Sequence, residues 1–169
     1  MGLLQVNTTT ITSATSSVTL TGIDDDSVYM LVLSNVAPSN DSKYLNLKFT
    51  VGGSASSTSN YDYAQYFQYT SGSAFGLAGT NGTSVNITNH RIGTGTSETV
   101  NGIFMVYNAN NTSEYTFMST ESANMDESPK LYGTQGGIVF TATDAVDGFY
   151  FSITSSSIAS GTFTLYKVV

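Results

Sequence analysis

The chain has 169 residues, of which 10% are charged and 49 are Ser or Thr. With only 5 Lys and Arg, a net charge of −7 and no run near the ~20 apolar residues of a membrane span, it is predicted to bind neither nucleic acid nor membrane. Its length predicts a single domain, residues 1–169, that buries roughly 70% of the surface of the unfolded chain. Such a core needs no metal or disulfide to fold, and the chain has no Cys.

Short apolar runs separated by Ser, Gly and Asn turns follow one another through the first half of the chain. Residues 28–36 are apolar on both faces and predict a buried central strand. Residues 61–70 suit either a strand or a helical turn, and their alternation favours a strand. The strands predicted in this half are 4–11, 18–21, 28–36, 44–51 and 61–70.

The second half is punctuated by two expected loops. Residues 71–84 contain four glycines and predict a long loop, and residues 122–130 predict another. Between them, residues 85–92 predict a polar strand with Val85, Ile87 and Asn89 on one side. The last predicted strands are 137–141, 149–153 and 162–168.

Residues 100–120 predict a β-hairpin, because two apolar runs flank the small polar segment 109–112. If those four residues form the whole loop, Phe104 faces Phe117 and Val106 faces Tyr115. Side chains alternate between the two faces of a strand, so both faces of this hairpin carry large apolar groups.

The second face of this hairpin therefore needs cover from another layer or subunit. Closed cyclic symmetry supplies such cover with one repeated surface, so we predict a homotrimer. Its predicted interface residues are Ile103, Met105, Tyr107 and Met118.

About ten short strands with Gly and Ser turns and no helical period predict an all-β fold. The expected architecture is an antiparallel β-sandwich with jelly-roll-like topology.

Two polar features are candidates for reactive sites. Asp24, Asp25 and Asp26 offer oxygen ligands for Ca²⁺, but adjacent carboxylates point in different directions, so a solvated turn is favoured. His90 is the sole histidine, and no GxSxG turn accompanies it, so a structural role is favoured over that of a catalytic base. Paired carboxylates that meet only in the fold remain an open alternative. We predict no catalytic residue, no metal site and no cofactor.

The densest aromatic cluster lies in residues 61–69. Such rings can stack on sugars or anchor an interface, and they can equally fill a core. Core or subunit packing is favoured here over ligand binding. The possible ligand-binding residues are Tyr61, Tyr63, Tyr66 and Tyr69.

Four phrases resemble β-rich structural modules of tailed bacteriophages, especially marine ones. They are SNYDYA (59–64), HRIG (90–93), YNAN (107–110) and IASGTFTLY (158–166). Such modules occur in head decoration proteins, appendages and tail fibres, and the resemblance implies a jelly-roll-like, often trimeric protein without catalysis. It carries no functional residues over, because the shared positions are turns and core.

The resemblance implies a non-enzymatic virion protein made in the host cytoplasm. A capsid decoration protein that stabilises the head is favoured, because the chain shows no attachment domain or coiled coil of a long fibre. Its partners would be copies of itself and other virion proteins such as the major capsid protein. The alternative is a tail fibre or appendage module that binds host-surface glycans.

Overall fold

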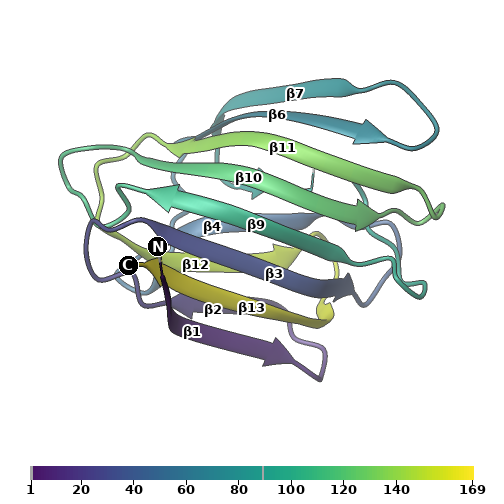
Figure 1. The fold of residues 1–169 in the computed structure, drawn as a ribbon, viewed down its shortest axis with the longest axis horizontal. Coiled ribbons are helices and arrows are strands. Elements are labelled where there is room, and N and C mark those ends of the chain that lie inside the picture. Colours follow the sequence, from purple (N-terminus) through teal and green to yellow (C-terminus); the bar gives the residue numbers. More distant parts are fainter. Residues whose placement is uncertain (1, 89) are drawn as a thin grey trace.

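The computed structural model describes residues 2–88 and 90–169, which form two antiparallel β-sheets joined by loops (Figure 1). The larger sheet, sheet A, contains in spatial order β1 (Leu3–Ile11), β13 (Ile158–Val168), β3 (Tyr29–Pro38), β9 (Val100–Tyr107), β10 (Thr116–Met125), β11 (Leu131–Phe140), β6 (Tyr61–Tyr69) and β7 (Phe75–Gly82). Sheet B contains β2 (Ser17–Thr21), β12 (Val146–Ile153), β4 (Leu45–Val51) and β5 (Ser54–Ala55), with β8 (Val85–Asn86) also paired to β4.

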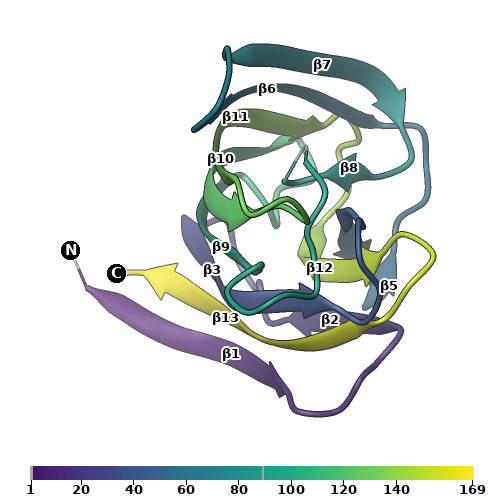
Figure 2. The ribbon, with the colours of Figure 1, turned by 90° about the vertical axis from the view of Figure 1, so that its right-hand side faces the viewer.

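Sheet A curls around sheet B, so that sheet B lies inside the curve of the larger sheet (Figure 2). The prediction of an all-β antiparallel sandwich is confirmed, whereas its jelly-roll topology stays a prediction. Within the two described ranges, no helix is long and apolar enough to cross a membrane.

The core lies between the sheets and is centred on aromatic rings. Phe140 of sheet A lies 5.7 Å from Phe49 of sheet B and 5.0 Å from Tyr61, measured between ring centroids. Phe49 also stacks parallel to Tyr61 at 5.9 Å and contacts Phe149 at 5.8 Å. All four side chains are fully buried, so these rings join the two sheets at the centre of the sandwich.

Three predicted boundaries are wrong. The segment 71–84 contains strand β7, which pairs with β6 along the edge of sheet A. Strand β10 extends to Met125 and β11 begins at Leu131, so the loop between them is only 126–130. The predicted strand 85–92 is reduced to β8 and an isolated bridge at Ile92, and its expected position Asn89 lies outside the described residues.

The predicted hairpin exists, but its register is wrong. Tyr107 pairs with Phe117 and Val106 with Met118, because the connection spans residues 108–115 and not four residues. A shift of three positions changes the face on which each β10 side chain lies. Met118 is therefore buried in the core at 1% exposure, and Phe117 is 47% exposed on the outer face of sheet A.

The longer connection is held against the body of the protein. Ala109 is fully buried, and its carbonyl accepts hydrogen bonds from the Val146 backbone N–H at 2.9 Å and from the Thr116 hydroxyl at 3.5 Å. The Asn110 side-chain amide donates to the carbonyl of Ile23 at 3.2 Å. These contacts extend the loop beyond the four residues that the sequence pattern indicates.

The three aspartates of the turn before β3 act as hydrogen-bond acceptors. The buried Tyr29 hydroxyl donates to Asp24 at 2.9 Å and to Asp25 at 3.1 Å, and the Lys167 ammonium donates to Asp25. The Asn111 amide donates to Asp26 at 2.9 Å. The turn is thus joined to the final strand, and its carboxylates serve the fold as well as facing solvent.

The Lys167 contact gives a testable pH dependence. The hydrogen bond from Lys167 holds the pKa of the Asp25 carboxyl below its ordinary value of 3.8. A carboxyl with a lowered pKa in the folded state stabilises the protein above its unfolded-state pKa, and that contribution fades as pH falls toward the folded-state pKa. We expect Asp25→Asn to lower Tm at pH 7, with the difference shrinking progressively below about pH 4.

Thermal unfolding monitored by circular dichroism between pH 7 and pH 2 checks this expectation. Asp144→Asn is the matched control, because Asp144 is exposed and makes no side-chain hydrogen bond or ion pair with the described residues. A Tm difference for Asp25→Asn that is constant over this range would contradict the role given to the ion pair.

Candidate functional site

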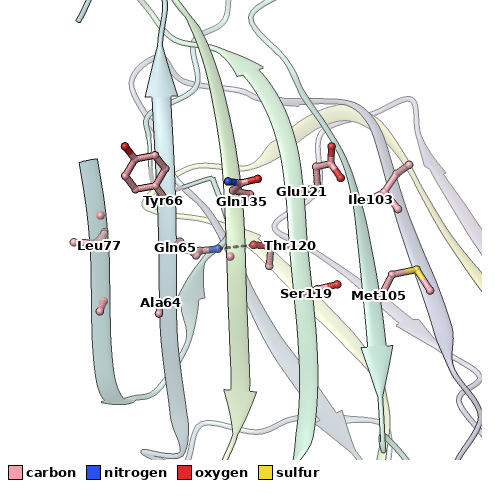
Figure 3. Close-up of a pocket in the computed structure, with 13 residues that line it drawn as sticks. Ala64, Gln65, Tyr66, Leu77, Ile103, Met105, Ser119, Thr120, Glu121 and Gln135 are labelled. Atoms are coloured by element: carbon pink, nitrogen blue, oxygen red, sulfur yellow. Dashed lines mark hydrogen bonds between the residues drawn. The ribbon is translucent and has the colours of Figure 1, made fainter. Parts of the chain in front are cut away.

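The outer face of sheet A carries its side chains in rows that run across the strands. Pairing places Tyr66 of β6 beside Gln135 of β11, Gln135 beside Glu121 of β10, and Glu121 beside Ile103 of β9. All four are exposed, and Figure 3 shows them side by side across the four strands. We call this row, Tyr66–Gln135–Glu121–Ile103, the outer ridge.

A groove runs along one side of the outer ridge. Its floor is the next row of paired residues, all of which are small. They are Ala78, Ala64, Gly137 and Ser119. Val139 and Phe117 form the opposite wall, and Met105 and Tyr107 close the end on β9. Two overlapping hollows of about 680 and 490 Å³ make up this transverse groove.

Smaller hollows lie on the other side of the outer ridge. One of about 300 Å³ is bordered by Tyr66, Gln68 and Ala123, and another of about 400 Å³ by Ile103, Asn101 and Ala123. The ridge therefore stands between two depressions. Side chains two residues apart on a strand are spaced by ~7 Å, so neighbouring rows of side chains on this face lie about that far apart.

A glycine beneath the groove determines how closely two of its strands approach. A Cβ atom added to Gly136 would lie 2.3 Å from the carbonyl oxygen of Ala64 and 2.6 Å from the Cα of Gln65. The bare backbone leaves room for Gln65 Nε2 to reach across β11 and donate to the Thr120 hydroxyl at 3.4 Å, on the buried side of the sheet (Figure 3).

The transverse groove is mainly apolar and carries negative charge. Ile103, Tyr107 and Phe117 are 39 to 50% exposed, which is a high exposure for large apolar side chains. Glu121 and Asp62 line the groove, and no Lys or Arg does so among the described residues. Such a surface fits an apolar or neutral partner and disfavours an anionic one.

The structure places three of the four predicted interface residues on the outer face of sheet A. Ile103, Met105 and Tyr107 lie on the outer face of β9, as predicted. The prediction for Met118 is wrong, because the three-residue register shift turns that side chain into the core. Phe117 occupies the corresponding outer position, where Tyr107 is its neighbour on β9.

The four candidate tyrosines have different environments. Tyr61 is fully buried, its hydroxyl accepts from the Phe49 N–H and donates to the Ser56 carbonyl, both at 3.0 Å, and burial raises its pKa to about 12. Tyr63 packs against the core and Tyr69 stacks on Tyr132 at 5.1 Å. Tyr66, 43% exposed, stands on the outer ridge where a ligand can contact it.

His90 does not belong to the outer face of sheet A. It lies near the loop between β10 and β11. Its ring stacks on Tyr132 with centroids 3.6 Å apart, and its Nδ1 atom is 3.9 Å from Asp126 Oδ2. Burial raises the pKa of the Tyr132 hydroxyl to about 12. Among the described residues, no serine hydroxyl is hydrogen-bonded to the His90 ring, so the structure does not assemble a Ser-His-Asp arrangement there.

The sequence did not predict the polar residues of the outer ridge or those near His90. Asp126 and Glu127 fell in the segment 122–130, which was expected to be a loop, and Glu121 lay beside it. Gln135 fell in the unassigned stretch before the strand predicted at 137–141. The sequence carries no clear signal of the extension of β10 to Met125, because the inward positions 120, 122 and 124 hold Thr, Ser and Asn and not apolar residues.

Comparison of the chain with protein-family models, with curated proteins and with solved structures finds no match. The functional argument therefore depends on the surface itself.

Proposed function

We propose that this protein is a non-enzymatic structural component of a bacteriophage virion, a decoration protein that reinforces the head by surface contacts. The proposal rests on one observation, which is that the outer face of sheet A exposes apolar side chains along the outer ridge and the transverse groove. This face is built on paired strands, so it is a rigid surface suited to assembly.

The same face also supports self-association into a ring. Heterologous contacts in a cyclic oligomer bring two different features of the same chain together. The outer face offers a ridge with Tyr66 and Ile103, and a groove with a small-residue floor beside it. We propose a homotrimer in which these features of neighbouring copies meet.

The first test measures mass and head binding together. Wild-type protein should have about three times the 17.9 kDa chain mass in light scattering, and should bind emptied heads of the phage that encodes it. Ile103→Glu combined with Phe117→Glu places two charges on the apolar face, so the variant should be a folded monomer with at least about 10-fold weaker head binding.

Leu4→Glu is the matched control, because Leu4 is 58% exposed on β1 at the opposite edge of sheet A. It should leave mass and head binding unchanged. Heads that carry the wild-type protein should also survive higher temperatures, because a ligand that binds only the intact shell stabilises it by mass action. A wild-type monomer at micromolar concentration, or heads whose stability is unchanged by the protein, would contradict the proposal.

A second candidate function follows from the composition of the outer ridge. Tyr66 offers an exposed ring face, and Gln135 and Glu121 offer an amide and a carboxylate in the same row. Aromatic stacking combined with such polar groups suits a neutral sugar chain. Glycan binding that Tyr66→Ala abolishes, together with unchanged head stability, would assign the protein to host recognition by a fibre or appendage.

A further inference from the structure

Three metal-ligating side chains meet beside the loop 126–130, on the opposite side of sheet A from the transverse groove. His90, Asp126 and Glu127 each contribute one ligand atom, and these atoms lie within 4.8 Å of one another. His90 comes from the irregular segment 90–99 and the two carboxylates from the β10–β11 loop. The cluster therefore joins two loops that are far apart in the sequence.

Several buried polar atoms in or close in sequence to this cluster have no hydrogen-bond partner among the described residues. They include His90 Nδ1 and Glu127 Oε2, which are members of the cluster itself. Asn124, 1% exposed, lies two residues before Asp126 on the same inward side of β10, and neither atom of its amide has a partner among the described residues. Buried polar groups without partners are rare in native proteins and indicate a bound ion or water.

The carboxylates of Asp126 and Glu127 each accept hydrogen bonds from other groups through one oxygen. Asp126 Oδ1 accepts from the backbone N–H groups of Ser128 at 2.8 Å and Lys130 at 2.9 Å, and Oδ2 lies 3.9 Å from His90 Nδ1. The Tyr132 hydroxyl also interacts with this carboxylate. Glu127 Oε1 accepts from the Ser42 hydroxyl at 3.3 Å and lies 4.0 Å from Arg91, so Oε2 is left without a partner. Outer contacts of this kind orient metal ligands in protein sites.

We propose that His90, Asp126 and Glu127 bind a divalent transition metal ion, for which Zn²⁺ is the best match. One imidazole nitrogen and two carboxylate oxygens form a three-ligand zinc site with an open position for water. Calcium fits poorly, because it takes six to eight oxygen ligands. This site is independent of the proposed function.

The donor separations require a small closure of the site. Donor atoms around a tetrahedral Zn²⁺ lie ~3.4 Å apart, given bond lengths of 2.0–2.2 Å. The side chains must therefore approach by about 1 Å, and the partly exposed His90 and Glu127 side chains can do so by rotating. The ion would then link the segment 90–99 to the β10–β11 loop.

Calorimetric titration of the full chain tests the proposal, using protein freed of metal with a chelator. The protein is purified without a histidine tag, because His90 is its sole histidine. We expect one Zn²⁺ per chain with micromolar or tighter affinity, a rise of several degrees in Tm at saturation, and no response to Ca²⁺. His90→Gln and Glu127→Gln should each weaken Zn²⁺ binding more than about 10-fold.

Glu121→Gln is the matched control, because Glu121 is an exposed carboxylate on the outward side of the same strand β10. It should leave Zn²⁺ affinity unchanged. The two ligand variants are expected to stay folded, since both side chains are partly exposed, and circular dichroism checks this. Absence of Zn²⁺ binding by the wild type, or equal affinity in wild type and His90→Gln, would overturn the proposal.

Discussion

Phe140→Ala should lower the free energy of unfolding by about 3–5 kcal/mol, the range measured when a buried Phe is truncated to Ala. Phe140 is fully buried, and its ring contacts Tyr61 within sheet A and Phe49 in sheet B. Truncation removes the ring that joins the two sheets and leaves a cavity between aromatic neighbours that cannot easily move inward. Chemical denaturation monitored by tyrosine fluorescence or circular dichroism gives the value.

The control for this substitution is Phe75→Ala on edge strand β7. Phe75 is 48% exposed, so its truncation should cost clearly less than that of Phe140. Equal losses for the two variants would mean that the Phe140 ring does not occupy the centre of the core.

Gly136→Ala should destabilise the protein by at least ~1–3 kcal/mol, the cost of forcing extra atoms into a packed site. The added Cβ would meet the backbone of Ala64 and Gln65 on β6, and backbone atoms cannot rotate away as a flexible side chain can. Strands β6 and β11 would have to separate. Because these strands carry the groove floor and the outer ridge, head binding should weaken along with stability.

Gly133→Ala is a closely matched control. It lies three residues earlier on the same strand, and among the described residues no atom beyond its own chain neighbours lies within 4 Å of the Cβ position. Its stability should be close to that of the wild type. A Gly136→Ala variant as stable as Gly133→Ala would show that β6 and β11 lie farther apart at Gly136 than the structure places them.

The sequence was sufficient to predict the fold class and most strands, because buried strands alternate with turn residues. It was insufficient for the register of the central hairpin. The contacts that lengthen its loop, from Ala109 to Val146 and from Asn110 to Ile23, join residues distant in the sequence. A short polar segment marks where a chain turns, but long-range contacts decide how many residues the turn contains.

Strand β7 was missed because its glycines resemble a loop. An edge strand needs backbone pairing on one side only, and β6 provides it. Gly79 has a further role, since a Cβ there would lie 2.7 Å from the Tyr63 ring. The glycine therefore makes room for an aromatic side chain of the neighbouring strand, a relation that strand propensities do not contain.

The candidate sites depended still more on tertiary structure. Tyr66, Gln135, Glu121 and Ile103 come from four strands, and only their pairing places them in one row. His90 and Asp126 are likewise brought together by the fold. Sequence pattern predicted the outward apolar residues of β9 but could not show which residues of β10 and β11 stand beside them.

The pairing of β1 with β13 has a consequence for the time course of folding. Residues 3–11 form their sheet contacts with residues 161–168, so β1 cannot form this pairing until the chain has been synthesised through β13. Topologies dominated by such distant pairings fold in milliseconds to seconds, slower than proteins with local contacts. In the interval, β3 would present an unpaired edge, because its neighbour β13 is also missing. The waiting β1 contains no charged residue, Gly or Pro, so it is open to mispairing until β13 is made.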